Sequence, residues 1–220
     1  MILYGSTMSP FARVVRVVAR ETGMLESIRE VIADPWGDDA FRRINPLGKI
    51  PALVTDEDDV LYDSPVICEY LDTLHDGPSL FPPQSRHRWR TLTLHACACG
   101  LMDAAYLRRN EAIRPQPGTI SNSFIDRQDA AIGAALDALE ADIEQLASSL
   151  TIASIAAGTA LGYLDFRYPD CGWRARCPAL AEWWSTLGTR PSFAGTGHTD
   201  PPGVIAPSMA LGLRLTGEKR

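Results

Sequence analysis

The segments NPLGKIPALV, residues 45–54, and YDSPVI, residues 62–67, decide the fold of the first part of the chain. In the first segment Pro46 and Gly48 end the preceding helical pattern, and the apolar run that closes at Val54 predicts a short strand. In the second segment a serine, a proline and then apolar residues at helical spacing predict the start of a helix. A turn, a strand and a helix therefore follow closely on one another.

Pro51 opens the predicted strand, which is unusual because proline lacks the N–H that a strand donates to its neighbour. Proline is tolerated at the first residue of a strand or at an edge. If the Ile50–Pro51 bond is cis, the backbone of Ile50 turns outward. Its N–H and C=O would then be offered to an extended peptide, while its side chain packs in the core.

The predicted helix has Ser64 as its N-cap and Pro65 as its first residue. Its apolar stripe consists of Ile67, Tyr70, Leu71 and Leu74. Such a start presents free N–H groups and a partial positive charge to a carboxylate, and the neighbouring Asp63 can bind an ammonium group. Together with the edge at Ile50, these residues suit a small peptide that has a free amino-acid end.

The spacing of Pro51 and the acid–serine pair closely resembles the glutathione-binding half of the cytosolic glutathione transferases, over about residues 1–195. The resemblance implies that Ile50 and Pro51 hold the cysteinyl backbone of glutathione, and that Asp63 and Ser64 hold its γ-glutamyl end. Lys49 would bind the glycyl carboxylate or would simply be solvated. The alternative interpretation of Asp63 and Ser64 is an ordinary turn and helix cap.

The elements expected in the first domain follow the order βαβ-α-ββα, which is that of a thioredoxin-like α/β domain. The resemblance to the transferases supports this fold, and the predicted domain spans residues 1–75. Its elements are a strand at residues 1–4, a helix from Phe11 that Gly23 stops, a strand at 28–33, a short helix at 38–44, strands at 51–54 and 60–62, and the helix from Ser64.

The loop at residues 6–10 determines which chemistry is available. In glutaredoxin-like relatives a cysteine precedes the proline that opens the first helix, and here Ser9 takes that place, so disulfide exchange lacks its nucleophile. A hydroxyl at a helix N-terminus is suited to stabilising a glutathione thiolate, which predicts Ser9 as the catalytic residue. Thr7 and Ser6 are the alternatives for that contact. The competing interpretation is that Ser9 only caps the helix.

After residue 75 a linker rich in proline and glycine at 76–85 precedes a chain that is predicted to be helical throughout. An all-α bundle domain is expected at 86–195, and a loosely attached tail at 196–220. Thr151 predicts a capping box in which Ser154 replaces the family's usual aspartate, and this change is expected to weaken the reciprocal bond. The other helices expected in the bundle are one at 86–110, a long amphipathic one running from Ile125 to Leu146, and one from Pro178 to about Arg190.

Composition bounds the partners and the location. The 220 residues are 45% hydrophobic, enough for a packed core, and the net charge of −6 without a basic cluster argues against nucleic acid. No apolar run is long enough for a bilayer, and arginines interrupt the N-terminal apolar pattern, so neither a membrane nor a signal peptide is expected. The five cysteines are odd in number and lack CxxC spacing, which favours a reducing compartment and predicts a cytoplasmic protein.

A site for a small hydrophobic electrophile is expected between the two domains, where clefts commonly form. Each of its candidate residues has an alternative interpretation as plain core or surface. Tyr106 could donate to a developing negative charge, and Arg109 could receive an acidic substrate. The histidines suggest no metal spacing, so no metal is predicted. The candidates are Met8, Phe11, Met102, Tyr106 and Arg109.

The resulting hypothesis is a homodimeric glutathione transferase of a bacterial serine-type subgroup, which conjugates the thiolate of glutathione, its substrate, to a small electrophile. An isomerase or lyase that uses glutathione would share every binding feature. A non-catalytic protein that binds glutathione or a partner is a further alternative, because Met8 stands where some transferase classes carry the catalytic serine. Whether Asp103 reaches a partner subunit's glutathione stays open.

Overall fold

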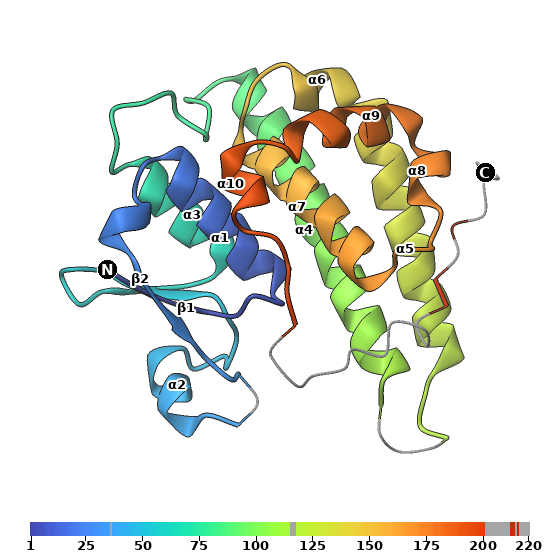
Figure 1. Ribbon diagram of the computed structural model, residues 1–220, viewed down its shortest axis with the longest axis horizontal. Helices are drawn as coiled ribbons and strands as arrows, with labels where there is room; N and C mark the ends of the chain where they lie inside the picture. The colour runs from blue at the N-terminus through green and yellow to red at the C-terminus, as the bar shows by residue number, and fades with distance from the viewer. Residues whose placement is uncertain (36, 115–117, 201–211, 214, 216–220) are drawn as a thin grey trace.

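The computed structural model describes residues 1–35, 37–114, 118–200, 212, 213 and 215 of the chain. An N-terminal sheet flanked by helices lies beside a larger bundle of helices (Figure 1). The prediction of an α/β domain followed by a helical domain is confirmed. Within the described ranges no helix is both long enough and apolar enough to cross a membrane.

The N-terminal domain follows the predicted βαβ-α-ββα order. Its elements are β1 (Ile2–Gly5), α1 (Pro10–Glu21), β2 (Arg29–Ile32), α2 (Asp39–Ile44), β3 (Ala52–Val54), β4 (Val60–Leu61) and α3 (Ser64–Asp72), with a 3₁₀ turn η1 (Leu25–Ser27) between α1 and β2. The strands lie in the order β2-β1-β3-β4. β1 pairs in parallel with β2 and antiparallel with β3, and β3 pairs antiparallel with β4.

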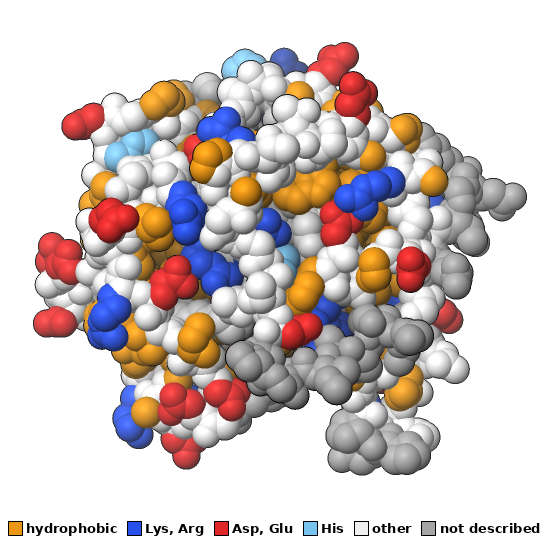
Figure 2. Space-filling model, viewed as in Figure 1, with side chains coloured by type: hydrophobic (Ala, Val, Ile, Leu, Met, Phe, Trp, Pro, Cys, Tyr) orange, Lys and Arg blue, Asp and Glu red, His pale blue; other side chains and the backbone are white. Residues whose placement is uncertain are grey.

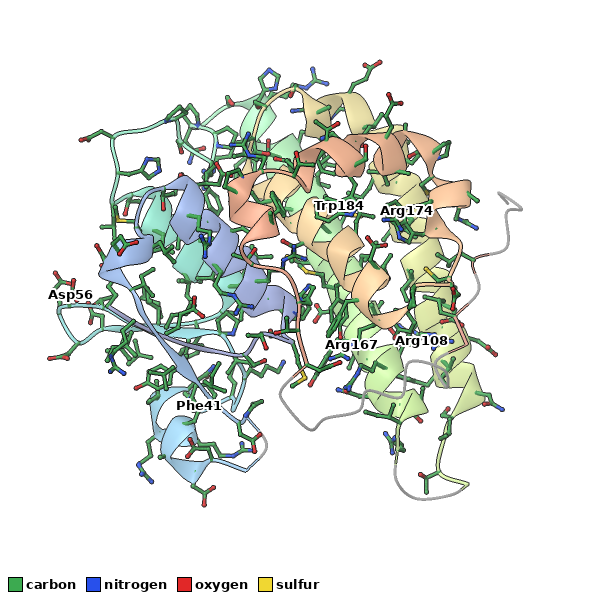
Figure 3. All side chains as sticks on the ribbon, viewed as in Figure 1. Phe41, Asp56, Arg108, Arg167, Arg174 and Trp184 are labelled. Atoms are coloured by element: carbon green, nitrogen blue, oxygen red, sulfur yellow. The ribbon has the colours of Figure 1, made fainter. Side chains whose placement is uncertain are left out.

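Helices cover both faces of this sheet. The valines of α1 pack with Leu53 of β3 and Ile67 of α3 in the main core, which continues into the helical domain. On the opposite face α2 places Phe41 against Ala33 and Ala52 in a separate small cluster (Figure 3). The sheet is thus covered on one face by α1 and α3, against which the helical domain packs, and on the other face by the short helix α2.

The helical domain is built around one buried helix. Its elements are α4 (Arg86–Ala112), α5 (Asn122–Ala141), α6 (Ile143–Ala147), α7 (Ile152–Arg167), α8 (Trp173–Arg176), α9 (Pro178–Leu187) and α10 (Pro191–Ala194). Every residue of α7 except Asp165 and Phe166 is buried, and α7 packs against both α4 and α1 (Figure 1). Gly158 and Gly162 allow a close approach of α9, because added side chains would meet Trp184 in both cases, and Gly162 also lies close to Arg13 of α1.

The capping box at the start of α7 forms with serine in place of aspartate. Thr151 Oγ1 accepts the Ser154 N–H at 3.4 Å, and Ser154 Oγ accepts the Thr151 N–H at 2.7 Å. Both bonds of the capping box therefore form with the shorter, uncharged side chain, and the weaker bond expected relative to aspartate stays a prediction.

Two helix boundaries differ from the predictions. α3 begins at Ser64 and has Asp63 as its N-cap, one residue earlier than expected. The long helix expected up to Leu146 ends at Ala141, because Asp142 leaves helical geometry and pairs its carboxylate with Arg90 of α4. The Asp142 C=O then accepts the N–H groups that start α6.

Candidate functional site

The loop before β3 is organised by the buried side chain of Asn45. Its Nδ2 donates to the Lys49 C=O at 2.7 Å, and its Oδ1 accepts the Leu47 N–H at 3.0 Å. The Ile50–Pro51 bond that follows is cis. The N–H and C=O of Ile50 make no hydrogen bond to any described residue, so this edge has a free donor and a free acceptor.

The start of α3 lies near charges from two other elements. Asp63 is exposed and its side chain makes no capping bond, whereas Ser64 is buried. On α4, burial raises the pKa of Asp103, the charge of Lys49 opposes this, and the charge of Asp63 adds to it. Lys49, Asp63 and Asp103 therefore share one electrostatic environment, to which Asp63 contributes an acid suited to an ammonium group.

The serine loop, residues 6–9, leads into α1. Ser9 is the N-cap, and its Oγ accepts the Ala12 N–H at 3.2 Å. Its hydroxyl proton has no acceptor among the described residues. Thr7, in contrast, donates its hydroxyl to the Thr199 C=O at 2.8 Å. Ser9 thus keeps a donor that Thr7 has already committed.

The residues expected at the electrophile site fall into two groups. Met102 is fully buried in the core, so its plain-core interpretation describes its side chain here. Tyr106 and Arg109, one and two helical turns further along α4, are partly buried. Both act electrostatically on the buried Tyr163 of α7, with Arg109 lowering and Tyr106 raising its pKa, although burial has the largest effect and the net direction is upward. The remaining candidates, Met8 and Phe11, are partly buried on either side of the α1 cap.

Two cavities on α4 include neither Ser9 nor the start of α3. One of about 510 Å³ opens at the end of α4, and one of about 420 Å³ lies near its start, between α4 and α6. Arg109 lines the first of them together with Leu107, Asn110, Glu111, Ile113, Arg114 and Phe124. Arg109 is the one residue that the prediction and a cavity have in common.

Comparison with known proteins identifies the family. Residues 8–74 match the family described as Glutathione S-transferase, N-terminal domain, and residues 122–183 match Glutathione S-transferase, C-terminal domain. The chain is 35% identical over 207 residues to the Uncharacterized GST-like protein YibF of Escherichia coli (strain K12), covering 92% of this chain and 99% of that protein. The chain belongs to the glutathione transferase family.

Two solved structures of glutathione transferase family members from Pseudomonas fluorescens Pf-5 are similar to it over almost their whole length. One has bound glutathione, is 43% identical, has a TM-score of 0.88 and covers 90% of this chain and 99% of its own. The other has bound S-(propanoic acid)-glutathione, is 42% identical, has a TM-score of 0.84 and covers 91% of this chain and 100% of its own. A glutathione-binding member of the family is therefore the coarse functional conclusion.

Sequence reasoning missed the role of three arginines of α1, one of which holds the serine loop while the other two bind the segment around α10. Arg13, Arg16 and Arg20 lie on one side of α1 at helical spacing, and Arg13 and Arg16 are buried. They donate to the C=O groups of Phe193, Ser6 and Gly195, respectively. Arginines at steps of three and four inside a valine-rich helix were a usable signal, because a buried cation requires polar partners.

The segment after α10, residues 196–200, belongs to the same arrangement (Figure 1). It runs back to the N-terminal domain, where Thr7 and Thr199 exchange hydrogen bonds. The expectation of a loosely attached tail is therefore wrong for residues 196–200. Most of the remaining tail, residues 201–211, 214 and 216–220, lies outside the described residues.

A metal site was not predicted, and the described residues contain no group of three or more histidine, cysteine or acidic side chains that could hold a metal ion.

Proposed function

We propose that this protein is a serine-type glutathione transferase that joins the glutathione thiolate to a small electrophile. The observation that carries the proposal is Ser9. Its Oγ is fixed by the Ala12 N–H at the positive end of α1, while its hydroxyl proton has no described acceptor. A thiolate at this position would receive both the hydroxyl hydrogen bond and the favourable field of the helix.

In this proposal glutathione lies extended along the edge at Ile50. The free N–H and C=O of Ile50 pair with the cysteinyl backbone, and Pro51 follows as the first residue after that edge. Asp63 binds the α-amino group of the γ-glutamyl residue, and the N-terminus of α3 at Ser64 binds its α-carboxylate. Lys49 precedes Ile50, and its charge acts on Asp103 of α4. In this proposal it binds the glycyl carboxylate.

The reaction is attack of the thiolate sulfur on an electrophilic carbon. A sulfur–carbon bond forms, and either a leaving group departs with its electron pair or, in an addition, the substrate takes up a proton. Ser9 lowers the thiol pKa by donating to the charged form, so that more thiolate is present near neutral pH. Tyr106 supplies a hydroxyl donor on the opposite wall, for negative charge that develops on the electrophile.

We further propose that the electrophile carries a carboxylate. The Pseudomonas fluorescens relative with 42% identity binds a glutathione conjugate whose sulfur bears propanoic acid. Arg109 provides a partly buried cation in the same region as Tyr106, and Met8 and Phe11 provide apolar surface for the rest of a small substrate.

The first test is calorimetry of glutathione binding, with the ultraviolet absorbance of the bound thiolate read across pH. A Ser64→Ala variant should bind glutathione more weakly. A Ser9→Ala variant should raise the pKa of the bound thiol by about one to two units, because a hydrogen bond to a charged group is worth about 1.5–3 kcal/mol. Ser6→Ala is the matched control in the same loop and should leave that pKa unchanged.

Two outcomes would redirect the proposal. If the parent protein binds no glutathione at millimolar concentration, the transferase assignment fails and the partner-binding alternative takes its place. If glutathione binds and is recovered unchanged while the substrate is rearranged or cleaved, the protein is an isomerase or lyase. Mass spectrometry of the products separates these cases from conjugation.

A homodimer through α4 and a cytoplasmic location complete the proposal. From Trp89 on, the exposed residues of α4 other than Arg90 recur at alternating steps of four and three, which is the spacing of a helix that packs against another helix. They are Trp89, Thr93, Ala96, Gly100, Asp103 and Leu107. Asp103 would then face the partner subunit. Sedimentation of the parent and of an Ala96→Arg variant tests this, and a monomeric parent contradicts it.

A further inference from the structure

The segment Thr196–Asp200 reaches the serine loop from the end of the helical domain. Thr7 Oγ1 donates to the Thr199 C=O at 2.8 Å, and the Thr199 N–H donates back to the Thr7 C=O at 3.4 Å. His198 Nδ1 lies 3.4 Å from the same Thr7 C=O. Since a carbonyl oxygen can only accept, His198 must carry its proton on Nδ1.

The helical domain fixes the ring of His198. It stacks on Phe166 with ring centroids 5.3 Å apart and planes inclined by 15°, and its edge meets Tyr163 at 5.4 Å. Both aromatic residues belong to α7, the most buried helix. At the end of that helix lies Arg167 (Figure 3). It pairs with Asp200 at 2.9 Å and so holds the last residue of the segment.

The surroundings of His198 keep it neutral. Basic side chains gather over α1 on this face of the molecule (Figure 2). Burial, followed by the charge of Arg13, lowers the pKa of His198 to about 3; the hydrogen bond to the Thr7 C=O opposes this, and Arg16 and Arg167 add smaller lowering effects. A neutral ring has one N–H, and here the Thr7 C=O is its acceptor, so the tautomer is set.

Ser6 and Ser9 of the serine loop also make hydrogen bonds. The Ser6 C=O accepts from the Ser9 N–H and from Arg16, each at 3.2 Å, and the Ser9 Oγ accepts from Ala12. The His198 contact falls on Thr7, two residues before Ser9. A shift of the Thr7 peptide would therefore be passed directly to the donor that faces the thiol.

We propose that His198 is a positioning residue for the thiol-stabilising serine, acting through the Thr7 C=O. This rests on the proposed function, because it assumes that Ser9 contacts the glutathione thiol. The segment Thr196–Asp200 then makes the geometry of the serine loop depend on the docking of the helical domain. Among the described residues no hydrogen bond joins Ile50 or Ser64 to this segment, so the proposed glutathione edge should be indifferent to it.

The test compares three variants for glutathione affinity and for the pKa of the bound thiol. His198→Ala removes the contact with Thr7, and His198→Gln can restore a donor to it. Arg190→Gln is the control, because it removes the pair between Arg190, just before α10, and Glu21 of α1, away from the serine loop. His198→Ala should raise the thiol pKa by about one unit, a tenfold loss of thiolate below the pKa, with glutathione affinity changed less than about threefold. His198→Gln should recover most of the shift.

Amide hydrogen exchange on the ligand-free protein separates this inference from the proposed function. His198→Ala should speed exchange in residues 6–12 and leave residues 50–54 and 63–66 unchanged. Unchanged exchange in residues 6–12 overturns the positioning role whether or not glutathione binds. An equal thiol pKa shift in Arg190→Gln also overturns it, since the effect would then be general loosening. Loss of glutathione binding in the parent, by contrast, refutes the proposed function.

Discussion

The two loops that carry the proposed site are held in place in different ways. The loop at residues 45–50 is held from within, because Asn45 bonds to both Leu47 and Lys49. The serine loop has local bonds at Ser6 and Ser9, but it is also held from a distance, since the partner of Thr7 is Thr199, 192 positions further along the chain. Under the proposed function, this difference predicts that glutathione binding and thiol activation can be separated by mutation.

The difference has a thermodynamic reason. Closing a short loop around an asparagine costs little chain entropy, so the edge at Ile50 needs only its own domain. The contact between Thr7 and Thr199 requires the whole helical domain to be folded and docked. Loosening of the domain interface should therefore reach the serine loop before it reaches the glutathione edge.

The largest effect is expected from Gly162→Ala, which disturbs the packing of α7 against α1 at the interface between the domains. The added methyl would overlap Arg13 Nη1 and lie 3.2 Å from Trp184, so the buried guanidinium would have to shift and its bond to the Phe193 C=O would be disturbed. Overpacking of this kind should lower the free energy of unfolding by about 3 kcal/mol, measured by urea titration.

Gly133→Ala is the matched control for that variant. An added methyl at residue 133 meets its nearest neighbour, Arg176, at 3.6 Å, an ordinary contact distance, so helix propensity should make this change neutral or stabilising by up to about 1 kcal/mol. Equal stability of the two variants would show that the approach of α1 to α7 at Gly162 is not tight.

A smaller effect is expected from Asn45→Ala, which breaks the local side. Loss of both side-chain bonds at a buried position should lower the free energy of unfolding by about 2 kcal/mol and weaken glutathione binding about tenfold. Asn45→Asp keeps the acceptor for the Leu47 N–H, so its stability and glutathione affinity should lie between those of the parent and of Asn45→Ala. Hydrogen exchange in residues 6–9 should not change, and faster exchange there would contradict the separation of the two loops.

The smallest effect is expected on the pH dependence of stability, through the pair that Glu21 of α1 forms with Arg190 at the domain interface. Burial raises the pKa of Glu21, but hydrogen bonds from Arg190 and Ser192 outweigh it and leave the pKa below its usual 4.5. A carboxyl whose pKa is lower in the folded than in the unfolded protein stabilises the fold at a pH above its unfolded-state pKa. That stabilisation is lost as the pH falls through the folded-state pKa. Urea titrations from pH 6 to pH 3 should therefore show a flatter acid decline for Glu21→Gln than for the parent.

Arg190→Gln should flatten the same decline, because it removes the other half of the pair. If both variants lose stability toward acid as steeply as the parent, the pair contributes nothing to the attachment of α10 to α1.

Much of the N-terminal domain could be predicted because its signals are local. Pro10 and Ser9 start α1, Pro51 opens the edge of the sheet, and alternation of strand and helix patterns sets the βαβ-α-ββα order. These features depend on backbone preferences of a few neighbouring residues. The same reasoning placed the start of α3 one residue late, because the serine and the aspartate before it are both acceptable caps.

The sequence by itself therefore determined the order of elements, the family resemblance and the position of Ser9 at the N-terminus of α1. Only the tertiary structure showed that the Thr7 hydroxyl donates to a residue from the far end of the chain, whereas the Ser9 hydroxyl has no acceptor among the described residues. It also placed His198 against two aromatic residues of α7, the contacts from which its proposed role is argued. Such contacts carry no periodic signal along the chain, because they depend on how the two domains dock.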